Sequence, residues 1–357
     1  MRKPKGLSPP PTVGRTLGSS EIQRLIGRNE FHSISLRLPC LCNLRCPYCY
    51  SQARKLSWAK DRESVTYNEL LSILDDAFAL GVTTVSIVGD GEPMLYKEGD
   101  NDVFSLLKHL RDSGKRSVLF TNGTLIGEKE ARQLYDSGVT LIAKQNSLND
   151  TIQNELVGKK QAQQMQDGLG YLAKAGFARE SRLAIHTIIC RRNYQEIPKL
   201  WRLWRQRDII PYVQVAVPPR GRKEREQFFK EYWVPPNEVK RLFSCLLRID
   251  QKEFGYTWDP DYTYPIAAMG CSVVRTGFAV TSKGDVQLCA YTEAPLGNVK
   301  ERPLRSILEQ SIVRRIRRYD YQHATEWPFY GCRALTHNLE RDRFSPDPFW
   351  WGVDKVM

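Results

Sequence analysis

The stretch that decides the fold is SISLRLPCLCNLRCPYCY, residues 33–50, in which a short apolar segment runs into a loop rich in cysteine. Residues 33–39 predict a β-strand. Cys42, Cys46 and Cys49 follow it with the spacing C-x3-C-x2-C. Three thiolates in one loop are able to hold three irons of a cubane cluster, whereas 4Fe–4S clusters usually have four cysteine ligands. The fourth iron would then lack a protein ligand, and an iron of that kind is a place where substrate binds.

Zinc is the alternative interpretation of this loop. A structural zinc site takes four ligands, usually in two closely spaced pairs. The sequence has no second C-x2-C pair, and the next cysteine, Cys190, is far along the chain. The spacing therefore favours a cluster over zinc.

Predicted strands and helices alternate about six times before residue 251. The first helix, residues 66–81, has a capping box of Thr66 and Glu69 and ends at Gly81. Apolar strands that alternate with helices indicate a parallel sheet covered by helices, with its chemistry at the carboxyl ends of the strands. The expected strands are 33–39, 83–89, 116–123, 140–148, 181–190 and 209–217, and the later helices are 102–114, 128–138, 163–176, 194–208 and 236–251. In the first helix, Leu70, Ile73, Leu74 and Ala77 are expected to face inward.

This alternation of predicted strands and helices ends near residue 253, where a second, smaller module is expected to begin. Residues 277–291 predict a β-hairpin that turns at residues 283–285, and residues 303–320 predict an amphipathic helix. Leu304, Ile307, Leu308 and Ile316 lie on its apolar face. Residues 1–30 are rich in Pro and Gly and read as a flexible tail. The expected divisions are 1–30 for the tail, 31–252 for the barrel, 253–340 for the small α+β module and 341–357 for an aromatic C-terminal tail.

Composition limits the class of protein. No run approaches the roughly 20 apolar residues that a membrane-spanning helix needs, and no apolar segment of a secretory signal follows the charged N-terminus. Nine cysteines in a chain that looks cytoplasmic indicate metal binding or catalysis more than disulfides. The net charge of +13 suits an acidic partner, although many proteins are simply basic.

With Tyr48 before the last cysteine, the loop reads C-x3-C-x-aromatic-C and resembles the signature of the radical S-adenosylmethionine (SAM) superfamily. The resemblance covers roughly residues 31–250 and implies a partial (β/α)6 TIM-like barrel. It implies that Cys42, Cys46 and Cys49 hold a 4Fe–4S cluster and that SAM binds its open iron. One electron from a flavodoxin- or ferredoxin-type donor then cleaves SAM to a 5′-deoxyadenosyl radical, which abstracts a substrate hydrogen. Tyr48 is expected to pack over the cluster and contact adenine.

Further motifs at strand ends fit a SAM site. GDGEP, residues 89–93, resembles the family's GGEP motif, in which Glu92 would hold the SAM amino group, and Asp90 departs from it by replacing a glycine. Polar residues at later strand ends would contact the SAM ribose and carboxylate, although capping or other structural roles are an equal alternative. The expected SAM-binding set is Tyr48, Gly89, Asp90, Gly91, Glu92, Asn122, Lys144, Asn146, Ser147 and His186.

The C-terminal module carries a second set of cysteines: Cys271, Cys289 and Cys332. Their layout resembles the twitch module, a truncated form of the SPASM domain, and implies a second, auxiliary 4Fe–4S cluster. Ala334 and Leu335 stand where the four-cysteine version has its last thiol, so the fourth ligand stays open among His337, Asn338, Cys245 and no protein ligand. Three independent buried cysteines are the alternative. Cys40 and Cys190 are interpreted as structural.

Several substrate classes compete. The resemblance to twitch dehydrogenases favours oxidation or rearrangement of a small polar natural product such as an amino sugar or cyclitol. A ribosomal peptide is a second class. Nucleic acid is a third, with residues 314–318 and 220–225 on phosphates and with Trp201, Trp204 and Tyr212 as stacking surfaces. An iron–sulfur redox sensor is the non-enzymatic alternative. No catalytic acid or base stands out from the sequence.

Overall fold

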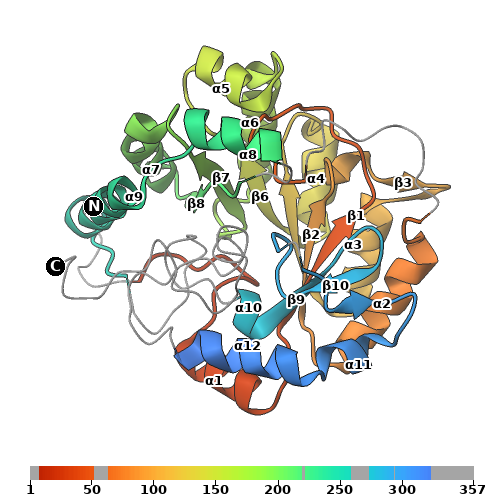
Figure 1. Cartoon of the computed structure of the whole chain (residues 1–357). Coiled ribbons are helices and arrows are strands. Elements are labelled where there is room, and N and C mark those ends of the chain that lie inside the picture. The colour runs from red at the N-terminus through yellow and green to blue at the C-terminus, as the bar shows by residue number, and fades with distance from the viewer. Residues whose placement is uncertain (1–7, 52–62, 219–221, 259–272, 293, 323–357) are drawn as a thin grey trace.

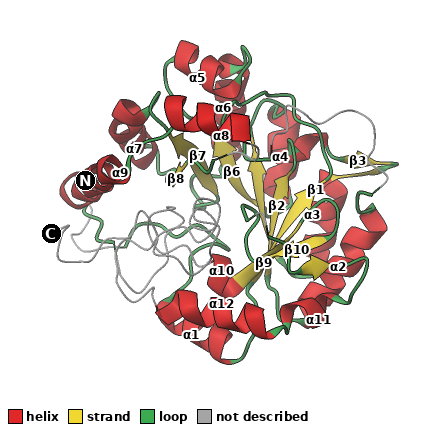
Figure 2. Ribbon diagram, viewed as in Figure 1, coloured by secondary structure: helices red, strands yellow, loops and turns green. Residues whose placement is uncertain are grey.

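The structure is a computed structural model, and it describes residues 8–51, 63–218, 222–258, 273–292 and 294–322. A single large sheet runs through the molecule, with helices packed around its outside (Figure 1). Its strand order is β11-β10-β9-β1-β2-β5-β6-β7-β8. Figure 2 shows these strands fanning across the centre of the molecule, with helices on the flanks.

Six of these strands, from β1 to β8 in that order, pair in parallel and confirm the predicted strand series. The apolar side chains of these strands that face the helices form the main core, in which Leu36, Ile87 and Leu119 are fully buried. The strands are β1 (Ser33–Leu38), β2 (Thr84–Gly89), β5 (Arg116–Thr121), β6 (Thr140–Lys144), β7 (Leu183–Ile189) and β8 (Ile210–Val215).

The helices that follow these strands cover the sheet. The predicted capping box of Thr66 and Glu69 is present at the start of α2, whose expected apolar face is buried. Two helices in this region were not predicted: α5, and α8 in the polar segment RKEREQFFKE. The helices are α2 (Tyr67–Ala79), α3 (Val103–Asp112), α4 (Glu128–Asp136), α5 (Asp150–Val157), α6 (Ala162–Ala175), α7 (Ile197–Gln206), α8 (Arg222–Glu231) and α9 (Pro236–Ile249). Short elements complete this part: the 3-10 turns Pro93–Leu95 and Tyr194–Glu196, the strands β3 (Lys97–Glu98) and β4 (Asn101–Asp102), and a π-helical turn, Asp250–Phe254.

The C-terminal module continues the main sheet. Its predicted hairpin is present as β9 (Gly277–Val280) and β10 (Asp285–Gln287), and Gly284 in the turn has a φ of 88°. Strand β9 pairs in parallel with β1, the strand that leads into the cysteine loop. The module therefore lies directly beside that loop. The domain divisions remain a prediction. The pairing of β1 with β9 joins residues on the two sides of the boundary expected at residues 252 and 253.

The predicted helix at 303–320 is two helices, α11 (Leu304–Leu308) and α12 (Ser311–Gln322). The four expected apolar residues are all buried. The remaining elements of the module are α10 (Val273–Thr276) and β11 (Gly297–Asn298).

The expectation of a flexible tail at residues 1–30 is wrong for its described part. Helix α1 (Ser19–Gly27) buries Ile22 and Leu25 and lies beside α12 (Figure 1). Arg317 of α12 is 1% exposed and donates hydrogen bonds to the carbonyls of Leu25 and Glu30, at 3.4 and 2.6 Å. The guanidinium thus binds one carbonyl in the last turn of α1 and one just beyond the helix, and so fixes the position of α1 against α12. The Pro- and Gly-rich composition gave no sign of this contact.

Among the described residues, no helix is both long and apolar enough to cross a bilayer.

Candidate functional site

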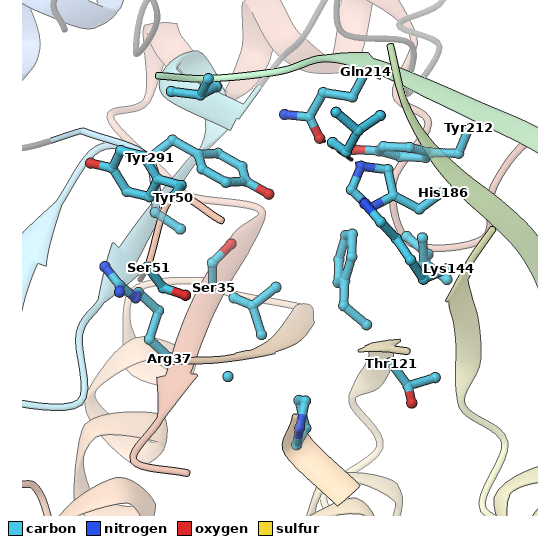
Figure 3. Close-up of a pocket in the computed structure, with 18 of the residues that line it drawn as sticks. Ser35, Arg37, Tyr50, Ser51, Thr121, Lys144, His186, Tyr212, Gln214 and Tyr291 are labelled. Carbon is cyan, nitrogen blue, oxygen red and sulfur yellow. Dashed lines mark hydrogen bonds between the residues drawn. The ribbon is translucent and has the colours of Figure 1, made fainter. Parts of the chain in front are cut away.

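The site is a cavity of about 300 Å³ inside the curve of the sheet, closed on one side by the cysteine loop. Side chains from all six parallel strands reach it, because alternate residues of a strand point to the same face. Figure 3 shows Ser35 and Arg37 of β1 on one side and Lys144, His186, Tyr212 and Gln214 of β6–β8 on the other. The inner face of the sheet therefore presents polar side chains among apolar ones such as Phe120 and Ile142.

Cys42, Cys46 and Cys49 all line this cavity. Burial, together with a smaller contribution from the neighbouring thiols, raises the pKa of Cys42 to about 11 and that of Cys46 to about 12. Buried thiols of this kind need a positive charge beside them to be present as thiolates, and a metal centre supplies one.

The three thiols fit a cluster better than a single ion. Among the described residues, no group of three or more His, Cys, Asp or Glu side chains is arranged to hold one metal ion. Sulfur ligands of one zinc ion lie only about 4 Å apart, since each Zn–S bond is about 2.3 Å. All three thiols line one cavity, and together they would hold a 4Fe–4S cluster with one iron left without a protein ligand.

The GDGEP turn packs directly on the base of the cysteine loop. A Cβ at Gly91 would lie 2.1 Å from the carbonyl oxygen of Leu41, and one at Gly89 would lie 2.5 Å from the Cys40 sulfur. Only glycine permits so close an approach. The amide of Glu92 donates to the same Leu41 carbonyl at 2.8 Å. The sequence motif thus holds the loop in place as well as lining the cavity.

Glu92 is 2% exposed and lines the cavity. Its carboxylate accepts hydrogen bonds from the Thr121 hydroxyl and the Asn122 amide, each at 2.7 Å. Burial nevertheless raises the pKa of Glu92 to about 7. The Asn122 side chain donates in turn to Asn43 at 2.8 Å, which joins this turn to the cysteine loop.

Asp90, the departure from the family motif, faces the C-terminal module. It forms an ion pair with Arg37 of β1 and accepts a hydrogen bond from Ser282 in the β9–β10 turn. Its backbone carbonyl accepts from Ser51 at 2.8 Å. Asp90 therefore joins the GDGEP turn, the first strand and the small module.

Lys144 and Tyr48 lie together on the opposite wall. The Lys144 ammonium sits 5.4 Å from the centre of the Tyr48 ring, and both residues line the cavity. Burial lowers the pKa of Lys144 to about 8. The Tyr48 ring also packs against Tyr232, next to α8, with ring centres 6.2 Å apart.

Asn146 and Ser147 are fully buried and lie outside the residues that line the cavity. The Asn146 side chain donates to the Tyr48 hydroxyl at 2.7 Å and accepts from the Ile188 amide at 3.1 Å. Ser147 donates to Glu196. These contacts favour a role in positioning Tyr48 over direct contact with a cofactor.

His186 lines the cavity from β7. Its Nε2 lies 2.9 Å from the Gln214 amide oxygen, to which it donates, as the dashed line in Figure 3 marks. Burial, with Lys144 nearby, holds the pKa of His186 well below its usual range. The ring is therefore neutral at physiological pH.

The second set of cysteines is described only in part. Cys289 is buried and lines the same cavity as the three loop cysteines. Cys271 and Cys332, like His337 and Asn338, lie outside the described residues. Cys245 is half-buried against the main core, on α9.

Sequence reasoning missed several cavity residues. Arg15 enters from the segment expected to be a tail, and Tyr50 and Tyr291 flank the cysteine loop (Figure 3). Gln214 had a detectable signal, because it is a polar residue within the apolar strand β8. Arg15 and Tyr291 had none, since only tertiary packing brings them to the cavity.

The features expected to contact nucleic acid are partly internal: Arg314, Arg315 and Arg318 are exposed, whereas the two tryptophans are not, and residues 220 and 221 lie outside the described residues. Trp201 and Trp204 are 0% and 4% exposed, and Tyr212 faces the cavity. Arg317, within the basic run 314–318, is buried against α1. Trp201 and Trp204 are therefore not stacking surfaces, because their apolar area fills the core.

Comparisons with known proteins agree with this geometry. The family model of the radical SAM superfamily matches residues 38–203, and that of the SPASM iron–sulfur cluster-binding domain matches residues 271–332, which begin at Cys271 and end at Cys332. An AdoMet-dependent heme synthase of Methanosarcina barkeri is 26% identical over 353 residues, covering 88% of this chain and 95% of the relative. A GTP 3′,8-cyclase of Rippkaea orientalis is 30% identical over 207 residues, covering 56% of this chain and 60% of the relative.

Solved structures share the fold. Streptococcus suis SuiB bound to S-adenosylmethionine has a TM-score of 0.64 at 19% identity, covering 94% of this chain and 79% of SuiB. The enzyme anSMEcpe with bound AdoMet has a TM-score of 0.62 at 15% identity, covering 89% of this chain and 93% of that one. The chain therefore belongs to the radical SAM superfamily, as an enzyme with a C-terminal SPASM-type module, and its cofactors are SAM and 4Fe–4S clusters that include an auxiliary one.

Proposed function

We propose that the protein oxidises a substrate held in the cavity that Cys289 shares with the three cysteines of the loop. The observation that carries this proposal is that Cys289 lines the same cavity as Cys42, Cys46 and Cys49. When bound, SAM and the loop cluster supply a 5′-deoxyadenosyl radical that takes one hydrogen atom from the substrate. A two-electron oxidation then requires the substrate to lose one more electron and a proton, and an auxiliary cluster at Cys289 is an electron acceptor of the right kind and place.

In this proposal, some residues of the cavity hold the cluster and others bind SAM. Cys42, Cys46 and Cys49 hold the cluster. Glu92 receives the SAM ammonium group, which its buried carboxylate attracts. Lys144 pairs with the SAM carboxylate from the opposite wall, and Tyr48 packs over the cofactor. Gly89, Gly91 and Asn122 shape that wall.

The proposal extends to the class of substrate. An amino sugar or cyclitol finds no support among the relatives reported above. The size of the cavity favours a small molecule, or one side chain of a larger molecule, that enters beside SAM. The similarity to an AdoMet-dependent heme synthase over 88% of this chain supports a SAM-dependent reaction.

A peptide is the second candidate. SuiB has also been solved bound to its precursor peptide SuiA, and that structure covers 94% of this chain with a TM-score of 0.62. A peptide side chain would fit the cavity as well as a free molecule would. The electron donor in either case is a flavodoxin- or ferredoxin-type protein.

The test is anaerobic incubation of the reconstituted enzyme with SAM and dithionite. Wild type is expected to form 5′-deoxyadenosine and methionine and to hold about eight irons, four for each cluster. Cys289→Ala is expected to hold fewer irons and still cleave SAM. A Cys42→Ala variant that cleaves SAM as wild type does, or a Cys289→Ala variant with the full iron content, would contradict the assignment of ligands.

A second measurement separates the two substrate classes. SAM cleavage is compared after adding either a fraction of small metabolites or a fraction of peptides from the same cell extract. Stimulation by the small-molecule fraction alone supports the first candidate, and stimulation by the peptide fraction alone supports the second.

A further inference from the structure

The cysteine loop has an exposed outer face as well as the inner face that lines the cavity. Cys42, Leu44, Cys46 and Tyr48 alternate along the loop, and all of them line the cavity. Arg45, between Leu44 and Cys46, is exposed and lies outside the residues that line it. The loop therefore has a solvent-facing side that begins one residue from a proposed cluster ligand.

The carboxyl end of α5 packs against this outer face. The Arg45 amide donates to the Val157 carbonyl at 2.9 Å. A Cβ at Gly158, whose φ is 68°, would lie 2.3 Å from the Arg45 carbonyl oxygen, so only glycine permits this approach. Leu44 and Val157 are buried in one apolar cluster. The residues that follow Gly158 are thus held beside Arg45.

Cations gather around this contact. Lys159 and Lys160, which follow the glycine, are both exposed. Arg191 and Arg192, just after β7, are exposed too, and Arg192 forms an ion pair of 3.2 Å with Glu155 of α5. Glu155 is the one carboxylate in an ion pair with these cations among the described residues. We call the five cations the loop-side basic surface: Arg45, Lys159, Lys160, Arg191 and Arg192.

We propose that the loop-side basic surface binds an acidic electron-donor protein, which passes one electron to the cluster held by the cysteine loop. The donor loses that electron and the cluster gains it. Opposite charges draw two proteins together and orient their encounter, and complexes of electron-transfer proteins need only small interfaces. This inference rests on the proposed function in taking Cys42 and Cys46 as cluster ligands, and it adds the place where the donor binds.

The position of the surface favours an electron donor over other acidic partners. None of its five cations is among the residues that line the cavity, so a donor bound there leaves SAM and substrate in place. A nucleic acid would be attracted by the same charges. Bound there, it would lie against the outer face of the loop and away from the cavity, whereas an electron donor needs this closeness to the cluster.

Binding is measured without turnover, by calorimetric titration of the oxidised holoenzyme under anaerobic conditions. The probes are oxidised flavodoxin, which is acidic, cytochrome c, which is a basic redox protein, and a single-stranded oligonucleotide. Flavodoxin is expected to bind about tenfold or more tightly than the other two. Its affinity is expected to fall about threefold or more when salt is raised from about 50 to about 500 mM, because salt screens exposed charges.

Paired variants locate the binding site. Lys159→Gln/Lys160→Gln removes two charges beside the loop and is expected to weaken flavodoxin binding about tenfold. Arg314→Gln/Arg318→Gln removes two exposed charges from α12, at the opposite end of the molecule from α5 (Figure 1), and is expected to leave binding unchanged. The proposal is overturned if flavodoxin does not bind wild type, if cytochrome c or the oligonucleotide binds as tightly, or if the lysine variant binds flavodoxin as wild type does.

SAM cleavage separates a loss of docking from damage to the cluster. With dithionite as reductant, Lys159→Gln/Lys160→Gln is expected to form 5′-deoxyadenosine at the wild-type rate. With reduced flavodoxin below saturation, the same variant is expected to be about fivefold slower or more, and additional flavodoxin should restore its rate. An equal loss with both reductants would overturn the docking site. A wild-type enzyme that binds flavodoxin through these lysines and never cleaves SAM contradicts the proposed function while leaving the docking surface intact.

Discussion

Tyr50 and Tyr291 meet edge to face, with ring centres 5.5 Å apart and planes at 72° (Figure 3). Tyr50 directly follows Cys49, and Tyr291 comes two residues after Cys289. The pair therefore joins the cysteine loop to the small module at the edge of the cavity, which both rings line.

Removing this contact is expected to expose the loop cluster. An edge-to-face pair contributes about 0.5–1.5 kcal/mol beyond its buried area. We expect Tyr291→Ala to raise the rate of cluster loss in air about 2- to 10-fold, measured as the decay of iron–sulfur absorbance. Tyr291→Phe keeps the ring and is expected to match wild type. Equal rates for the two variants would show that the ring does not shield the cluster.

Gly91 and Gly170 form a matched pair of glycine-to-alanine substitutions. A Cβ at Gly91 would overlap the Leu41 carbonyl, whereas one at Gly170, inside α6, would meet nothing within 4 Å. Gly91→Ala is expected to displace the cysteine loop and to lower the iron content on reconstitution. Gly170→Ala is expected to keep the full iron content and to stabilise the fold by up to about 1 kcal/mol, because alanine is favoured within helices. A wild-type iron content in Gly91→Ala would show that the cysteine loop accommodates the added methyl group and still holds its cluster.

Asp250 provides a test of the part of the fold that supports the C-terminal module. Its carboxylate is fully buried and accepts hydrogen bonds from Trp201 and Trp258, each at 2.7 Å, and from Arg205, at 3.0 and 2.7 Å. It thus joins α7 to the end of α9 and to residue 258.

Asp250→Asn leaves the buried guanidinium of Arg205 without its counter-charge. Breaking a buried pair in this way costs about 3–5 kcal/mol, so we expect a large fall in thermal stability. Glu253→Gln is the control, since its pair with Arg202 has both side chains 40% exposed and contributes about 0–1 kcal/mol. Similar melting temperatures for the two variants would contradict this account.

The parallel sheet, its order of elements and the first cluster loop were all predictable from the sequence. Strand and helix periods are local signals, and C-x3-C-x2-C is a spacing within one loop. The position of Glu92 and its neighbouring glycines at the cavity was predictable in the same way, because they lie in a short motif at a strand end.

Contacts that depend on distant parts of the chain were not predictable. Arg15 and Arg317 look like ordinary solvated charges in the sequence, yet one lines the cavity and the other holds α1. Asn146 and Ser147 stand at a strand end as cofactor ligands often do, but neighbouring side chains bury them behind Tyr48. Tertiary packing decides whether a polar side chain lines the cavity or is buried behind it. That packing produces no periodic pattern in the sequence.

The buried side chain of His32 is expected to make the folded protein less stable in acid. It is 6% exposed, within hydrogen-bonding distance of the Thr83 and Thr84 hydroxyls and the Gly14 carbonyl. Burial lowers its pKa in the folded protein, although the nearby carboxylate of Glu21 acts in the opposite direction.

The unfolded chain takes up a proton at His32 near pH 6.5, whereas the folded protein does so only at lower pH. Stability is therefore fully present above pH 6.5 and falls below it, by at most about 1.4 kcal/mol per pH unit for this one proton. His32→Gln is expected to be less stable than wild type at pH 7.5, because it loses native contacts, but its melting temperature should fall less between pH 7.5 and pH 5.5. A wild-type slope in His32→Gln would assign the acid sensitivity to other groups.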